Sequence, residues 1–149
     1  MSNREIESLL GEAKIARFCT LNEDGTIHAA PVWFKYESRC LVVTTPVMSR
    51  KARNVRRNNS VTVLVDFEGP PAKGVMITGN ADTEDLTDGH LAQTALFFSK
   101  YMPMEKAQLY TRELFKLTNW VRIRVKPNRM SSFDYAKDEA YHSARSYHD

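Results

Sequence analysis

Apolar residues near the start of the chain recur at the spacing of one helix face. Those residues are Ile6, Leu9, Leu10 and Ala13. Asn3 stands before them in the position of a helix cap. After Gly11 the pattern changes, because the apolar residues from Ile15 onward stand in short runs rich in β-branched and aromatic side chains. The sequence therefore predicts an N-terminal helix within residues 1–13 and β-structure after it.

Seven runs along the chain have the composition of short strands. They cover residues 15–21, 26–35, 40–45, 60–67, 74–81, 120–126 and 129–135. Asp24 and Gly25 lie between the first two runs, and this pair supplies the positive φ that a tight hairpin turn needs. Strands that are short, sequential and joined by tight turns pair in antiparallel fashion. The sequence predicts an antiparallel meander or barrel rather than a parallel sheet.

The second of these strands contains Pro31, which has no backbone N–H to donate to a neighbouring strand. Alternation along the strand places Ile27, Pro31 and Trp33 on the same face. Because proline interrupts the hydrogen-bond ladder, we expect this strand to lie at a sheet edge or to carry a bulge. Its backbone would then be available to another partner.

Two internal segments have helical patterns. Residues 49–57 predict a short helix, and residues 88–117 predict a helical insertion that Pro103 divides in two. The expected core face of the short helix is Met48, Ala52 and Val55. The apolar stripes of the insertion are Leu91, Ala95, Phe98 and Met102, followed by Ala107, Tyr110, Leu114 and Leu117.

The composition is that of an ordinary globular domain, with 149 residues of which 42% are apolar and 26% charged. We expect one domain over residues 1–149, ending in a polar tail, residues 137–149, that is either a loose helix or disordered. Cys19 and Cys40 lie in apolar runs and fit buried thiols rather than disulfides or metal ligands. There is no signal-peptide pattern and no apolar run of the ~20 residues that span a membrane. These features predict a cytoplasmic protein without a membrane partner.

Five positive charges fall in one eight-residue segment that contains no acid. They are Arg50, Lys51, Arg53, Arg56 and Arg57. Removing them from the net charge of +3 leaves −2, so the basic character of the chain belongs to this segment. The charges begin at the first turn of the predicted helix, where hydroxyl groups, free N–H groups and the positive helix end favour a bound anion. Charge-assisted hydrogen bonds from Arg and Lys would add to this, and a phosphate monoester is the expected ligand group.

Two other interpretations of the basic segment stay open. Basic runs are commonly solvated helix faces that bind nothing. Nucleic-acid binding is disfavoured, because the neighbouring sequence has no helix-turn-helix or RNP-type aromatic pattern and the rest of the chain is slightly acidic. We therefore expect no nucleic-acid partner.

The order and spacing of these segments resemble a known family. The likeness runs from Ile15 to Phe133. It depends on GTIHAAPVWF at 25–34, VVTT at 42–45, SRKARNVRRN at 49–58, and the strands at 61–66 and 74–79. Together these stretches look like the pyridoxamine 5′-phosphate oxidase-like flavin-binding split-barrel superfamily. The resemblance implies a mainly β, antiparallel split barrel with Greek-key character and short peripheral helices.

The resemblance also implies a cofactor and a set of residues that bind it. Members of the superfamily are homodimers that bind flavin mononucleotide (FMN), or in some branches coenzyme F420, in clefts at the subunit interface. By this resemblance the phosphate would be held by Thr45, Ser49, Arg50 and Lys51. The flavin ring would meet the backbone of Val32, Trp33 and Phe34, with Thr44 lining the same cleft.

The function implied by the resemblance is an FMN-binding oxidoreductase that carries out two-electron redox chemistry on a small organic substrate. The C-terminal section lacks the Arg and His pattern of pyridoxamine phosphate oxidases proper, so oxidation of vitamin B6 is not expected. The continuation from Arg53 to Arg57 resembles a smaller branch that includes FMN- and F420-dependent reductases. An F420-dependent reductase is therefore one alternative, and a protein that binds a flavin or haem without turnover is another.

Few individual side chains are needed for such chemistry, because hydride transfer belongs to the flavin. We predict no catalytic protein residue. His28 fits an exposed or hydrogen-bonded strand residue better than a catalyst. His142 and His148 do not share a helix face, so no metal site is predicted. Trp33 and Trp120 either flank the ring or fill the core.

Overall fold

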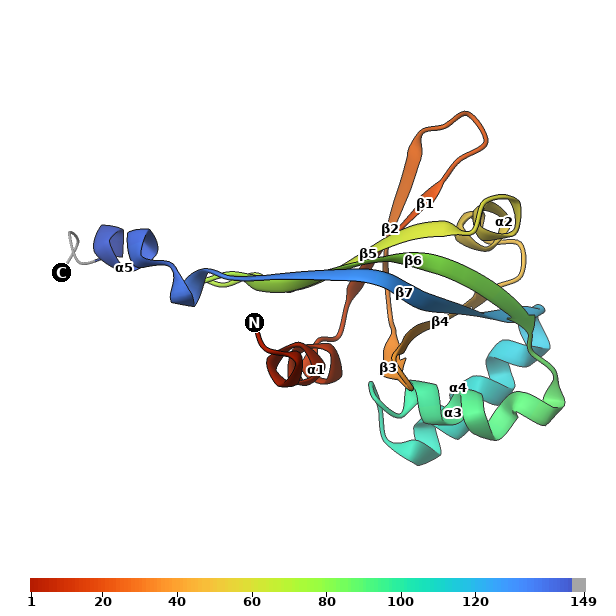
Figure 1. Cartoon of the computed structure of the whole chain (residues 1–149). Helices are drawn as coiled ribbons and strands as arrows, with labels where there is room; N and C mark the ends of the chain where they lie inside the picture. Colours follow the sequence, from red (N-terminus) through yellow and green to blue (C-terminus); the bar gives the residue numbers. More distant parts are fainter. Residues whose placement is uncertain (146–149) are drawn as a thin grey trace.

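A computed structural model describes residues 1–145 of the chain (Figure 1). One antiparallel sheet of seven strands, in the order β2-β1-β5-β6-β7-β4-β3, curls into a half-barrel. The strands are β1 (Ala16–Leu21), β2 (Ile27–Val32), β3 (Lys35–Glu37), β4 (Cys40–Pro46), β5 (Ser60–Phe67), β6 (Lys73–Asp85) and β7 (Trp120–Asp134). This arrangement confirms the predicted fold class, a mainly β antiparallel split barrel.

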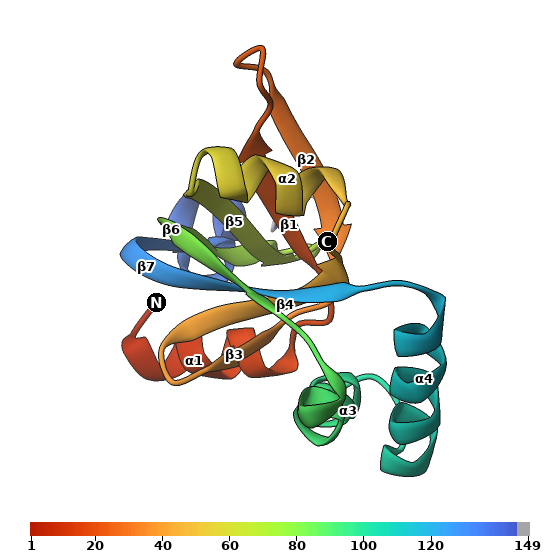
Figure 2. The ribbon, with the colours of Figure 1, turned by 90° about the vertical axis from the view of Figure 1, so that its right-hand side faces the viewer.

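Short helices surround the sheet. They are α1 (Asn3–Glu12), α2 (Arg50–Arg57), α3 (Leu91–Phe98), α4 (Met104–Leu117) and α5 (Glu139–Arg145), with 3₁₀ turns η1 (Asp88–His90) and η2 (Tyr135–Lys137). Figure 2 shows α2 lying across the β1–β5 side of the sheet, while α3 and α4 lie together beyond β4. None of the helices within residues 1–145 is long and apolar enough to cross a membrane.

The apolar residues form two clusters. The main one fills the half-barrel and is closed by Leu9 and Leu10 of α1 and by Ala52 and Val55 of α2. Strand alternation supplies the rest, as in β5, where Val61, Val63 and Val65 are buried. The second cluster joins α3 and α4 to the outer side of β4 through Val42, Phe97, Phe98 and Ala107. The helical insertion is therefore a separate layer on the barrel.

The predicted second strand is interrupted. Residues 26–35 contain β2 and the start of β3, with a break at Trp33 and Phe34. β2 pairs with β1 at one edge of the sheet, and β3 pairs with β4 at the other. The predicted edge position of Pro31 is confirmed. The strand-like pattern of residues 26–35 continues through Trp33 and Phe34, so the break is visible only in the strand pairing.

The last two predicted strands are one strand. β7 runs without a turn through Pro127 and Asn128 because the β6–β7 ladder shifts register between Thr78 and Gly79. A Cβ atom at Gly79 would lie 2.2 Å from the carbonyl oxygen of Lys126. The bulge therefore needs a glycine at this position.

Several local expectations differ from the structure. Ser2 rather than Asn3 caps α1, because its hydroxyl accepts from the Glu5 N–H while the Glu5 carboxylate accepts from the Ser2 N–H. Met48 precedes the cap of α2 and is 68% exposed, and Leu117 at the end of α4 is 79% exposed. The predicted strand end at Tyr135 is instead the start of η2; in the predicted tail, α5 agrees with the loose-helix alternative, and residues 146–149 lie outside the described residues.

Two glycines test this account of the bulge. Gly79→Ala places a methyl group against backbone that cannot move freely, and we expect it to lower the free energy of unfolding by about 2–3 kcal/mol. Gly11→Ala is the matched control, because a Cβ there meets nothing within 4 Å. Since Gly11 lies in α1, that change should raise the free energy of unfolding by about 0.5–1 kcal/mol. Urea denaturation measures both, and equal effects of the two variants would contradict the account.

Candidate functional site

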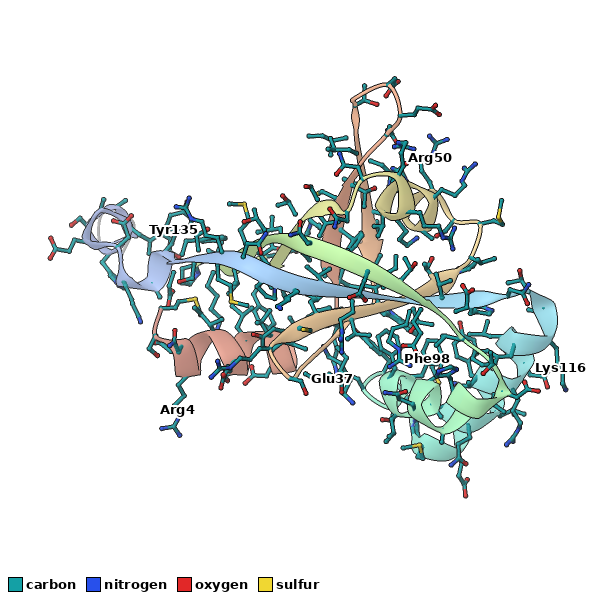
Figure 3. The ribbon with its side chains drawn as sticks, turned by 45° about the vertical axis from the view of Figure 1, so that its right-hand side comes forward. Arg4, Glu37, Arg50, Phe98, Lys116 and Tyr135 are labelled. Atoms are coloured by element: carbon teal, nitrogen blue, oxygen red, sulfur yellow. The ribbon has the colours of Figure 1, made fainter. Side chains whose placement is uncertain are left out.

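A pocket of about 290 Å³ opens between the end of β2, the end of β4, the start of α2 and the helical insertion. Its lining residues are Pro31, Val32, Trp33, Thr44, Thr45, Lys51, Phe97, Phe98, Tyr110, Leu114 and Trp120. Figure 3 shows Phe98 directed from the insertion toward the sheet. The pocket combines an aromatic wall with two threonine hydroxyl groups and one ammonium group.

The polar side of the pocket is built at the N-terminus of α2. Ser49 caps this helix, since its hydroxyl accepts from the Ala52 N–H at 3.3 Å. The Thr45 hydroxyl, at the end of β4, donates to the same Ser49 oxygen at 3.0 Å. The first turn leaves the backbone N–H groups of Arg50 and Lys51 without intrahelical acceptors. The helix start thus presents donors beside the pocket.

Lys51 is the charged residue of the pocket. Its side chain is half-buried, and burial lowers the pKa of its ammonium group below the usual value. It makes no hydrogen bond or ion pair with any residue in the part of the chain that the structure describes. An ammonium group in this state lacks the counter-charge that buried cations normally have.

The four arginines of the basic segment fall into two groups, one bonded to the backbone and one exposed. Arg56 donates to the carbonyl oxygen of Val47 at 2.9 Å, and Arg57 donates to that of Leu21 at 2.5 Å. These two arginines hold α2 against neighbouring loops and strands. Arg50 and Arg53 are exposed, with Arg50 beside the β1–β2 turn (Figure 3). Arg56 and Arg57 therefore anchor α2, whereas Arg50 and Arg53 extend into solvent.

Asn54 fixes the orientation of α2. It is buried, and its amide nitrogen donates to the Thr20 hydroxyl and to the Asn22 side-chain oxygen, both at 3.0 Å. Its own side-chain oxygen accepts from Arg57 at 3.2 Å. Because Asn54 lies on the inner face of the helix, these bonds turn Lys51 toward the pocket. Sequence reasoning assigned Asn54 no role, since a lone asparagine in a basic helix gives no signal of burial.

The eight predicted cofactor residues do not all lie in the same place. Those that line the pocket are Val32, Trp33, Thr44, Thr45 and Lys51. Ser49 lies behind them as the helix cap, and Arg50 is exposed on the first turn of α2. Phe34 is fully buried in the main core. The pocket therefore contains five of the eight, together with aromatic residues that the prediction had placed in helix cores.

Aromatic rings that line the pocket form a connected group with Tyr101, which lies behind them. Trp33 stacks on Tyr101, with ring centroids 4.4 Å apart and planes 8° apart, and meets Phe98 edge-on at 6.1 Å. Phe98 in turn meets Tyr110 at 5.0 Å. The helical stripes predicted Phe98 and Tyr110 as core residues, whereas Tyr101 lies between the helices and had no periodic signal. Trp33 and Trp120 both line the pocket.

Tyr101 also binds the backbone at the strand break. Its hydroxyl accepts from the Phe34 N–H at 2.8 Å and lies 2.8 and 2.9 Å from the carbonyl oxygens of Phe34 and Lys14, to one of which it donates. Burial raises the pKa of Tyr101 to about 12. The backbone N–H of Phe34 thus has its hydrogen-bond acceptor within the chain.

Lys100 reinforces the same contact. Its ammonium donates to the carbonyl oxygens of Phe34 at 3.0 Å and of Leu10 at 3.5 Å, and it lies 3.7 Å from the centroid of the Phe34 ring. Burial, followed by the charge of Lys14, lowers the pKa of Lys100 to about 8.

Two further sequence expectations concern histidines and metals. His28 was expected to be exposed or hydrogen-bonded, but it is partly buried and its Nδ1 has no hydrogen-bond partner among residues 1–145. No cluster of three or more His, Cys, Asp or Glu side chains suited to a metal ion occurs within the described range.

Comparison with known proteins identifies the family. The sequence matches pyridoxamine 5′-phosphate oxidase over residues 2–126. The chain belongs to the pyridoxamine 5′-phosphate oxidase family. No curated protein sequence is significantly similar to it.

Several solved structures share the fold of this chain. A conserved hypothetical protein from Mycobacterium tuberculosis has a TM-score of 0.79 and 21% identity, covering 91% of this chain and 86% of that chain. An F420 reductase has a TM-score of 0.63 and 23% identity, covering 84% and 94%. A FAD-binding protein from Mesorhizobium loti has a TM-score of 0.63 and 22% identity, covering 89% and 92%. At these identities the likeness shows the fold alone.

The Lys100 contact predicts a pH dependence of stability. Because the pKa of Lys100 is about 8 in the folded chain and 10.5 ordinarily, the unfolded chain binds more protons between these values. The free energy of unfolding of the wild type, relative to Lys100→Met, should therefore rise from pH 8 to pH 10.5. Urea denaturation at pH 7, 8.5 and 10 measures this, with the exposed Lys116→Met as control. A difference independent of pH would contradict the burial of the ammonium group.

Proposed function

We propose that the pocket binds FMN, with the phosphate at the start of α2 and the ring along the aromatic wall. The observation that carries this proposal is the half-buried ammonium of Lys51, which has no partner among the described residues. Leaving a desolvated cation unpaired is unfavourable. An anionic group of a ligand would supply the missing counter-charge.

The donors around Lys51 fit a phosphate monoester. The Ser49 oxygen already accepts two hydrogen bonds, so its own hydrogen is free to donate outward. The backbone N–H groups of Arg50 and Lys51 add two donors, and the helix dipole favours negative charge at this end. In the proposed complex these groups and Lys51 would hold the phosphate.

The aromatic wall fits a planar ring. Trp33, Phe98 and Trp120 line the pocket beside Val32 and Thr44. Planar ligands gain dispersion and stacking contacts from such rings. When bound, FMN supplies two-electron transfer to a small organic substrate, while this chain binds and orients the cofactor. The proposal is therefore an FMN-dependent oxidoreductase.

Coenzyme F420 is the second candidate. An F420 reductase has the same fold, and Arg50 and Arg53 leave positive charge exposed outside the pocket. A cofactor longer than FMN, with more anionic groups, would use those charges. The two candidates are separated by titrating each cofactor into the protein.

The phosphate assignment makes a measurable prediction. Lys51→Ala should raise the Kd for FMN, or for F420, by about 10- to 100-fold, because a hydrogen bond to a charged group contributes about 1.5–3 kcal/mol. The Kd is measured by quenching of cofactor fluorescence. Lys116→Ala removes a lysine at the exposed end of α4 and should leave the Kd unchanged. Absence of binding of both cofactors to the wild type would refute the function, whereas an unchanged Kd in Lys51→Ala would refute only the placement of the phosphate.

We also propose that a second copy of the chain covers the outer face of β1, β2, β5 and β6. Large apolar side chains are exposed on this face, Ile27 by 70% and Met76 by 43%, among polar residues that include the Arg17–Asp66 ion pair. A hollow of about 460 Å³, lined in part by Cys19, Leu21 and Ile27, lies on it. Alternation along β2 places Pro31 on the same face as Ile27, and Pro31 also lines the cofactor pocket. A copy seated here would therefore border the pocket.

The oligomeric state tests this surface. Ile27→Asp replaces the most exposed apolar side chain of this face with a charge and should convert a dimer into a monomer in size-exclusion chromatography with light scattering. Leu117→Asp is the matched control, since Leu117 is as exposed but lies at the end of α4. A wild-type monomer, or an Ile27→Asp protein that stays dimeric, would exclude this interface.

A further inference from the structure

The strand break between β2 and β3 carries an inference about a residue outside the pocket lining. We propose that Tyr101 positions Trp33 as the ring-binding wall of the pocket, by fixing the backbone at the break and by stacking on the indole. The inference builds on the proposed function, because it concerns the same pocket. Tyr101 does not line the pocket itself and acts through Trp33.

The first step concerns the backbone. The break lies where the chain passes from one edge of the sheet to the other, so neither strand ladder bonds the peptide groups there. The Tyr101 hydroxyl replaces the missing ladder, because it accepts from the Phe34 N–H and lies 2.8 Å from the Phe34 carbonyl oxygen. Phe34 follows Trp33 directly, so this contact sets the direction in which the indole leaves the backbone.

The second step concerns the ring. The Tyr101 ring covers one face of the Trp33 indole in a nearly parallel stack, and Phe98 meets the indole at an angle of 70°. No other ring within residues 1–145 is paired with Trp33, and the indole is 38% exposed in the pocket wall. One face of the indole is thus supported from behind, and the other stays available to a planar ligand.

The third step concerns the origin of Tyr101. It stands in the connection between α3 and α4, and both helices contribute lining residues, Phe97 and Phe98 from one and Tyr110 and Leu114 from the other. Lys100, the residue before Tyr101, donates to the same Phe34 carbonyl oxygen. The connection therefore links the helical wall of the pocket to the β2–β3 break. This link fixes the distance between the two sides of the pocket.

The experiment removes one oxygen atom. Tyr101→Phe keeps the stacking ring but leaves the Phe34 N–H without its acceptor, while Lys100 still donates to the Phe34 carbonyl oxygen. We expect the Kd for the cofactor that the wild type binds, FMN or F420, to rise by about tenfold, as for loss of a buried hydrogen bond. A second readout uses the free protein. In a Trp120→Phe background Trp33 is the remaining tryptophan, and its fluorescence should become more accessible to acrylamide when Tyr101→Phe is added.

The control is Thr111→Val, which also removes a buried hydroxyl from the helical insertion. That hydroxyl donates within α4, to the carbonyl oxygen of Ala107, and does not touch the break. It should change neither the Kd nor the quenching of Trp33. A Kd for Tyr101→Phe within twofold of the wild type overturns the inference and leaves the proposed function standing. If the wild type binds neither cofactor, the proposed function fails, and unchanged acrylamide quenching of Trp33 then overturns the inference by itself.

Discussion

The passage of the chain across the open side of the half-barrel is the constraint on which much of the structure depends. β2 and β3 follow each other within two residues, yet they occupy opposite edges of the sheet. The peptide groups between them have no strand partner, and a buried peptide group without a hydrogen bond costs about 1–3 kcal/mol. The Tyr101 hydroxyl accepts from the Phe34 N–H, and the neighbouring Lys100 donates to the Phe34 carbonyl oxygen, both from a helical connection far along the chain. Packing of α3 and α4 against β4 is thus coupled to closure of the barrel.

The basic segment shows how one charge pattern serves two physical purposes. Arg56 and Arg57 donate to backbone carbonyl oxygens, so they stabilise the position of α2 against its neighbours. Lys51, in the first turn of the same helix, is half-buried without a counter-charge among the described residues. Asn54 lies between them and fixes the rotation of the helix. The unfavourable placement of Lys51 is tolerated because its neighbours anchor the helix.

The sequence predicts those parts of the fold that local patterns determine. β5 begins and ends at the predicted residues, Ser60 and Phe67, because its alternation is regular and turn residues flank it. The break after Val32 was missed, since alternation runs through it and only a distant tyrosine compensates for it. The continuity of β7 through Pro127 was missed because a bulge opposite Gly79 absorbs the irregularity.

Prediction of the candidate site has the same limit. Thr45 and Lys51 stand beside a strand end and a helix start, where chemistry and position agree, and the structure places both in one pocket. Phe34 follows the same alternation as the pocket residues, but its side chain enters the core. Tyr101 and Asn54 act through contacts with residues distant in sequence, and a single sequence carries no record of such contacts.

The open sheet has two edges, and both are poorly suited to extension by another strand. β3 has only three residues, and β2 carries Pro31, which cannot donate to an incoming backbone. The chain that joins these edges also crosses the opening between them. Growth of the sheet into fibres is therefore obstructed at both ends, and a contact between copies would have to use the faces of the barrel, where recognition depends on side chains.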